Sequence, residues 1–138
     1  MTRRAVIALA LALTAALAAP APDAAAHDRK WRTTASWGLT ASGGEAAVGW
    51  VQSPHAPCVN DRVVKVFRVK PGRDALVGVD RRTGWPTGSG EGYINAPADL
   101  VAGKKYYIVV KKKNIGPRGH KHVCKAWTSG KVAWNPPS

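Results

Sequence analysis

The chain has 138 residues, a formal net charge of +13 at pH 7 and two cysteines. This length is typical of a single domain with one modest hydrophobic core. Beyond the N-terminal 26 residues, no segment approaches the roughly 20 apolar residues that a bilayer-spanning helix requires, which argues against a membrane-spanning protein.

The first 26 residues follow the plan of a secretory signal peptide. Arg3 and Arg4 precede an apolar run over residues 5–19, and three small residues at 24–26 form a cleavage site. Removing these 26 of the 138 residues leaves 112, with His27 first, and takes away two arginines and one aspartate, so that the charge becomes +12. We therefore expect a secreted protein, extracellular or associated with the cell envelope.

The remaining sequence predicts an all-β fold. Residues 27–44 are polar and turn-rich, so we expect an N-terminal arm there with at most one short strand. From residue 45 onward, short strand patterns recur at near-regular spacing between Gly- and Pro-containing turns, and no segment has helical periodicity. The predicted strands cover residues 46–51, 62–69, 76–80, 93–96, 106–110 and 122–127. This pattern favours an antiparallel, immunoglobulin- or prealbumin-like β-sandwich over residues 45–134, followed by a tail at 135–138.

The two cysteines are expected to form a disulfide. An oxidising compartment preserves disulfides, and two thiols allow only one pairing. A Cys58–Cys124 bond would enclose most of the domain and, in the chain-entropy model, stabilise it by roughly 4 kcal/mol.

Several short motifs suggest a family of modules. They are Cys58-x-x-x-Arg62-x-Val64-x-Val66-Phe67-Arg68, Pro71-Gly72-x-Asp74, Gly103-x-x-Tyr106-Tyr107-x-x-Val110 and Cys124. Over about residues 46–129, they resemble the small prealbumin-like or Cna-B-like modules of exported bacterial proteins, which are similar to the regulatory β-sandwich domains attached to carboxypeptidases. The resemblance implies a fold and no active site, and modules of this kind serve as stalks, spacers or adhesive units.

The densest positive charge surrounds the predicted turn between the last two strands. The cluster consists of Lys111, Lys112, Lys113, Arg118, Lys121 and Lys125. If this hairpin forms, the cations share one end of the domain and would attract polyanions by counterion release. An anionic envelope polymer or a sulfated glycan is the expected partner, and nucleic acid would bind only non-specifically. Alternatively, lysines beside an apolar strand protect its edge against aggregation, and the sequence leaves both interpretations open.

Trp85 is a candidate sugar-binding residue. It lies in the glycine-rich loop 81–92, and an exposed aromatic ring on a rigid loop can stack on the apolar face of a sugar. The alternative is that Trp85 folds back to cap the core. Trp50 and Trp127 lie on predicted strands, so we expect both in the core.

The histidines suggest a further alternative. A mature N-terminal His27 would chelate copper through its amine and imidazole, which resembles the opening of periplasmic copper-binding β-sandwiches and of copper oxygenases that attack polysaccharides. His120 and His122, two residues apart, could form a metal site with His27 or His55. Because no second histidine lies in a recognisable motif, we expect surface histidines, no metal site and no cofactor.

The sequence gives little support for an enzyme. Asp80, Glu91 and Asp99 are scattered around loops, the serines lack a nucleophile elbow, and both cysteines are assigned to the disulfide. We therefore expect a non-enzymatic binding or structural module, whose ligand and oligomeric state the sequence does not determine.

Overall fold

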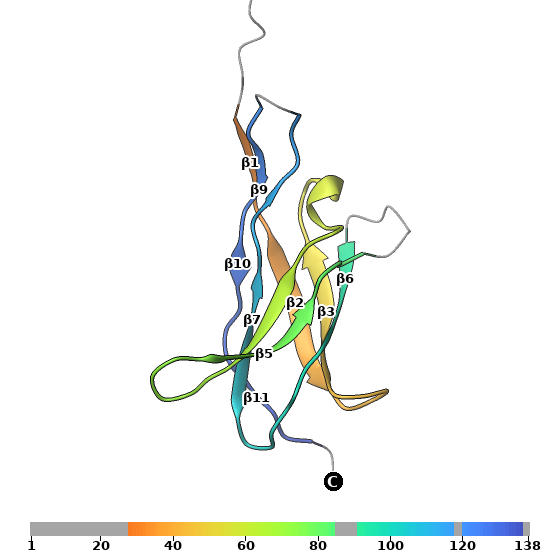
Figure 1. Cartoon of the computed structure of the whole chain (residues 1–138). Helices are drawn as coiled ribbons and strands as arrows, with labels where there is room; N and C mark the ends of the chain where they lie inside the picture. Colours follow the sequence, from red (N-terminus) through yellow and green to blue (C-terminus); the bar gives the residue numbers. More distant parts are fainter. Residues whose placement is uncertain (1–27, 85–90, 118–119, 137–138) are drawn as a thin grey trace, which may run out of the picture.

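The computed structural model describes residues 28–84, 91–117 and 120–136. Within these residues the fold is all-β, with eleven strands and one 3-10 helix at Ala56–Cys58. The molecule is elongated, with β1 and β9 at one end and β11 at the other (Figure 1). The residues before 28, Trp85, Arg118 and the last two residues lie outside the described ranges, so what the sequence predicts for them stays a prediction.

Three seven-residue strands form the first sheet. They are β2 (Thr34–Thr40), β3 (Ala46–Gln52) and β6 (Glu91–Pro97), in the antiparallel order β2-β3-β6. Along β2 and β6 apolar residues alternate with polar ones, whereas β3 is apolar at nearly every position. The period of two places one side of the sheet on the core.

The second sheet has the order β10-β7-β4-β5. Its strands are β4 (Val64–Arg68), β5 (Ala75–Asp80), β7 (Lys105–Val110) and β10 (Trp127–Thr128), and β11 (Val132–Ala133) also pairs with β7. Val64 and Val66 are fully buried, whereas Lys65 and Phe67 on the opposite face are only half-buried, so the predicted alternation is confirmed.

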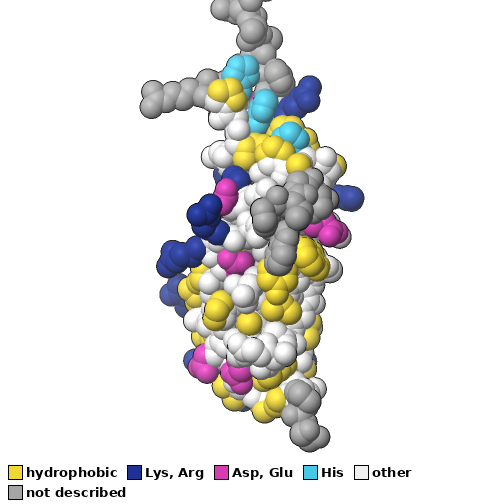
Figure 2. Space-filling model, turned by 90° about the vertical axis from the view of Figure 1, so that its right-hand side faces the viewer, with side chains coloured by type: hydrophobic (Ala, Val, Ile, Leu, Met, Phe, Trp, Pro, Cys, Tyr) yellow, Lys and Arg dark blue, Asp and Glu magenta, His cyan; other side chains and the backbone are white. Residues whose placement is uncertain are grey.

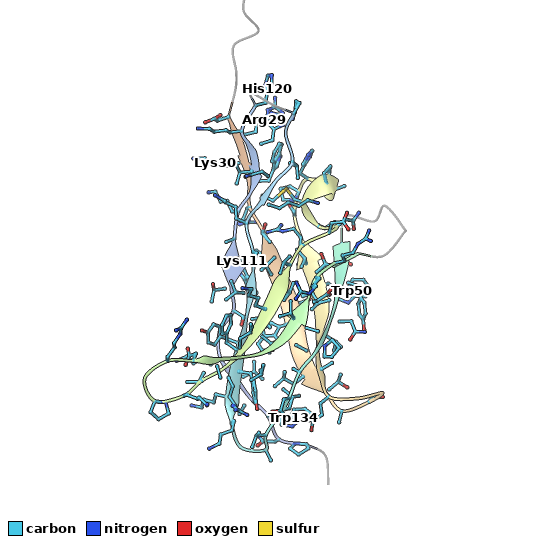
Figure 3. The ribbon with its side chains drawn as sticks, viewed as in Figure 1. Arg29, Lys30, Trp50, Lys111, His120 and Trp134 are labelled. Atoms are coloured by element: carbon cyan, nitrogen blue, oxygen red, sulfur yellow. A yellow bond between two sulfur atoms is a disulfide. The ribbon has the colours of Figure 1, made fainter. Side chains whose placement is uncertain are left out.

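The hydrophobic core lies between these two sheets. Ala47, Val51 and Ile94 of the first sheet join Tyr106 and the buried valines of β4 in one cluster. A single antiparallel bridge between Gly78 and Ala98 connects the sheets along one edge. The buried ring of Trp134 belongs to the same cluster and lies at the end of the molecule farthest from His120 (Figure 3).

A small third sheet stands at the upper end of the molecule. It consists of β1 (Arg29–Trp31), β9 (His122–Cys124) and β8 (Lys113–Asn114), with β1 parallel and β8 antiparallel to β9. The Cys58–Cys124 disulfide joins this sheet to the 3-10 helix, with 5.4 Å between the two Cα atoms. The predicted disulfide and the predicted antiparallel all-β class are thus confirmed.

The structure corrects three expectations. The segment expected to be an arm with at most one short strand contains both β1 and β2, because its backbone pairs with β9 and β3. The predicted strand 122–127 is interrupted after Cys124, and its last part pairs with β7 instead. Trp50 lies outside the core with 38 % of its surface exposed, whereas Trp127 does pack against the core.

Within the described ranges, we find no helix with the length and apolar character needed to cross a membrane.

Candidate functional site

The third sheet and its flanking residues collect eight cationic side chains, and we call this region the basic end. Its cations are Arg29, Lys30, Arg32, Lys111, Lys112, Lys113, Lys121 and Lys125. Asp28 is the one carboxylate in the described segments 28–32, 111–117 and 120–125. Arg29 lies beside His120 at the tip of the molecule, and Lys30 and Lys111 lie below them (Figure 3).

Backbone hydrogen bonds bring these separate segments together. The Arg29 amide donates to the Lys121 carbonyl at 3.1 Å, and the Lys125 amide donates to the Trp31 carbonyl at 3.0 Å. On the other side of β9, the Ile115 amide donates to the His122 carbonyl at 2.9 Å. These bonds hold cations that are far apart in the sequence on one small sheet.

A buried arginine supports the basic end from below. The Arg62 guanidinium is inaccessible to solvent and donates to the carbonyl oxygens of Lys111 at 2.7 and 3.1 Å, of Cys58 at 2.6 Å and of Lys125 at 2.9 Å. It also donates to the Thr33 hydroxyl at 3.1 Å. Burial lowers the pKa of Arg62 to about 10, so it still carries its proton at neutral pH. Arg62 therefore connects the ends of β7 and β9 to the 3-10 helix, with carbonyl oxygens as its hydrogen-bond acceptors.

The predicted lysines do not all have the same environment. Lys113 is half-buried, and its ammonium group donates to the carbonyls of Asn60 at 2.7 Å and Pro57 at 3.3 Å. The other described members of the predicted cluster, Lys111, Lys112, Lys121 and Lys125, have exposed side chains. The structure therefore gives Lys113 a role in the fold and leaves four lysines available to solvent.

Among the described residues, no carboxylate forms an ion pair with the exposed cations of the basic end. In the part of the chain that the structure describes, the one ion pair joins Arg82 to Asp61 at 3.0 Å, outside this region. Like charges gathered on so small a sheet repel one another and attract mobile anions.

Sequence reasoning missed the contribution of β1. Arg29, Lys30 and Arg32 are a dense cationic run, but the sequence pattern places them in the N-terminal arm, away from the predicted lysine cluster. The run itself was visible in the sequence. Its proximity to Lys121 and Lys125 depends on the parallel pairing of β1 with β9. These strands are far apart in the sequence, and no local sequence pattern predicts their pairing.

The histidines gather around an aromatic ring at the same end. Trp31 stacks on His55 with ring centroids 4.1 Å apart and contacts His122 edge-on at 5.5 Å. His120 lies edge-on to His122 at 5.9 Å. Among the described residues, however, no three His, Cys, Asp or Glu side chains are arranged to hold a metal ion. The copper hypothesis also required His27, which precedes the described range.

Two of the three candidate carboxylates, Asp80 and Glu91, accept hydrogen bonds within the fold. Asp80 accepts from the backbone amides of Arg82 and Asn95, each at 2.9 Å. Glu91 accepts from the side-chain amide of Gln52 at 2.9 Å.

No model of a known protein family matches this chain, and the search of curated proteins found no significant match.

Proposed function

We propose that this is an exported, non-enzymatic module that associates with anionic polymers at the cell envelope through its basic end. In this proposal, residues 1–26 are a signal peptide and the two larger sheets form a prealbumin-like sandwich. The observation that supports it most directly is the convergence of eight cations on one small sheet and the residues that flank it, with a single nearby carboxylate in the described segments.

The arrangement of the cations favours a polymer as the partner. Apart from the half-buried Lys113, these side chains are exposed and spread over the third sheet and its flanks, so they present an extended charged surface. A polyanion that lies along such a surface releases several counterions at once, whereas a small anion releases few. The binding would be governed by charge density and not by the sequence or composition of the polymer.

The proposal is tested by measuring heparin binding to the mature protein as a function of salt. For a dense polyanion such as duplex DNA, each neutralised contact adds about one unit to the slope of log affinity against log salt. The test variant is Lys111→Gln/Lys112→Gln, in which both side chains are exposed. Lys113 stays unchanged because its hydrogen bonds to the 3-10 helix region would confound the result.

A control variant with the same loss of charge is available on another loop. Lys70 and Arg73 are exposed residues between β4 and β5, so Lys70→Gln/Arg73→Gln removes two cations elsewhere. We expect the basic-end variant to flatten the slope by about one to two units, with little change for the control. Thermal stability should change little in either, because exposed charges contribute little to folding.

Two results would overturn the proposal. Equal loss of binding in both variants would mean that net charge, and not the basic end, attracts the polymer. Full binding by Lys111→Gln/Lys112→Gln together with faster aggregation would mean that these lysines protect a strand edge.

A further inference from the structure

The side of the β2-β3-β6 sheet that faces away from the core is a second candidate surface, and we call it the outer face. Ala35, Trp37 and Leu39 of β2 pack toward the core, as do Ala47 and Val51 of β3. Since side chains alternate along a strand, the even-numbered residues of β2 and β3 point outward, and so do the odd-numbered residues of β6.

The outer face carries no positive charge. The three strands contain no lysine or arginine, although the whole chain has 21 of them. The one charged side chain on these strands, Glu91, accepts a hydrogen bond from Gln52 at 2.9 Å. Figure 2, which views the molecule from the right-hand side of Figure 1, shows hydrophobic and uncharged groups over much of the surface, with some Asp and Glu among them and Lys and Arg toward the edges. The outer face therefore has no positive charge with which to select an anionic ligand.

Two aromatic rings form the centre of the outer face. Trp50 is 38 % exposed and lies directly opposite Tyr93 on the neighbouring strand, with ring centroids 5.1 Å apart and planes at 60°. Trp50 points away from the core on the flank opposite Lys30 (Figure 3). Aromatic rings held on a rigid sheet offer apolar faces to which the C–H faces of pyranose rings can pack. Ser36 and Asn95, the outward neighbours of these rings, offer hydrogen bonds to sugar hydroxyls.

A glycine keeps the surface beside Trp50 flat. Gly38 points outward in the interior of β2, where glycine weakens a strand relative to residues with a side chain. The fold does not require a glycine there, because its φ is not positive and an added Cβ would meet no atom within 4 Å. Gly49 differs, since its φ is 156° and an added Cβ would collide with the backbone of β2. Strand packing therefore explains Gly49, whereas no contact in the described fold requires a glycine at position 38.

A depression continues the outer face toward the β2–β3 turn. It has a volume of about 350 Å³, and its lining includes Tyr93, Asn95, Thr40 and Glu45. Oxygen- and nitrogen-bearing side chains thus follow the aromatic pair along one direction, as a chain of sugar units requires.

From these observations we infer that the outer face binds a neutral polysaccharide chain, with Trp50 and Tyr93 stacking on its pyranose rings and Asn95 and Thr40 contacting its hydroxyls. This site is separate from the basic end in residues, charge and ligand chemistry. The inference stands whether or not the basic end binds polyanions.

The test is a titration of the mature protein with cellohexaose, laminarihexaose and N-acetylchitohexaose, followed by tryptophan fluorescence and calorimetry. We expect at least one of the three to bind, with an affinity nearly unchanged between low and high salt because no ion pair is involved. Trp50→Ala should weaken that binding by about tenfold or more, since one stacking contact is removed.

The sharper variant is Gly38→Val, which adds a branched side chain where the fold has room for it. It should keep or raise the thermal midpoint, because valine favours strands, while weakening hexaose binding by about tenfold. Leu76→Ala is the matched control for Trp50→Ala, because it removes a 50 %-exposed apolar side chain from the other sheet. It should leave binding unchanged.

The inference is overturned if none of the three hexaoses binds, or if Gly38→Val and Trp50→Ala bind as well as the native protein. It is also overturned if sedimentation shows a dimer that Trp50→Ala dissociates while no hexaose binds, since the outer face would then be an interface between two copies. Lys111→Gln/Lys112→Gln should bind hexaose normally, so a failure of this site and a failure of the basic end are distinguishable.

Discussion

The basic end and the outer face are built in different ways. The basic end stands on short strands of two or three residues, and a disulfide and a buried arginine connect them to the rest of the molecule. The outer face belongs to three seven-residue strands whose other side forms part of the hydrophobic core.

The comparison shows how one small domain can present two surfaces of different chemistry. The third sheet has eight residues, of which only Trp31, Val123 and Cys124 are apolar, so it buries little apolar surface and depends on covalent and hydrogen-bonded connections. A sheet that covers the core has its inner positions fixed by packing and leaves its outer positions open to other residue types. Damage to the connections should therefore affect the basic end first.

The largest effect is expected on removing the disulfide. In the chain-entropy model, closing a loop with a sequence separation of 66 residues is worth roughly 4 kcal/mol. Cys58→Ala/Cys124→Ala should lower the free energy of unfolding in urea by that order. Hydrogen exchange should show a greater loss of protection in β9 than in β3. Equal losses in both strands would contradict the view that the basic end depends on the disulfide more than the outer face does.

Replacing the buried arginine should have the next largest effect. Arg62→Met removes the donor that three carbonyl groups share, and leaving buried acceptors unsatisfied costs about 1–3 kcal/mol for each. We expect a loss of about 3 kcal/mol in the free energy of unfolding, allowing for partial access of water. The control is Arg82→Met, which removes an exposed arginine paired with Asp61 and should change stability by no more than about 0.5 kcal/mol. Similar losses in the two variants would refute the anchoring role of Arg62.

The smallest effect concerns the β4–β5 hairpin, which lies outside both surfaces. The Lys70 amide at 3.1 Å and the Tyr107 hydroxyl at 3.0 Å donate to Asp74 and hold the pKa of its carboxyl below the ordinary value of 3.8. The charged form therefore stabilises the fold above about pH 4, and this contribution is lost as the pH falls through the lower pKa of the folded state.

The measurement for the hairpin is the thermal midpoint between pH 5 and pH 2. The native protein should lose slightly more stability over this range than Asp74→Asn, which has no such charge to lose. Oligosaccharide binding near pH 4 should be the same in both proteins. A difference in binding would show that the hairpin and the outer face are coupled.

Much of the β-architecture could be predicted from the sequence. The alternation of Val64 and Val66 with Lys65 and Phe67 predicted a half-buried strand, and β4 has that pattern. The disulfide followed from the number of cysteines in a chain with a secretory signal pattern. The strand pattern is local, and two cysteines allow only one pairing, so the sequence alone is enough to define both features.

Only the tertiary structure decided which strands are neighbours and therefore where the surfaces lie. The parallel pairing of Arg29 with His122 places β1 at the basic end, and the pairing of Trp50 with Tyr93 creates the aromatic centre of the outer face. In the sequence, Arg62 is only the first residue of a predicted strand. Its role in the fold depends on carbonyl groups 49 and 63 residues away, which no local pattern indicates. Local periodicity determines which residues form strands and which side of each is apolar, whereas long-range backbone pairing determines which side chains meet.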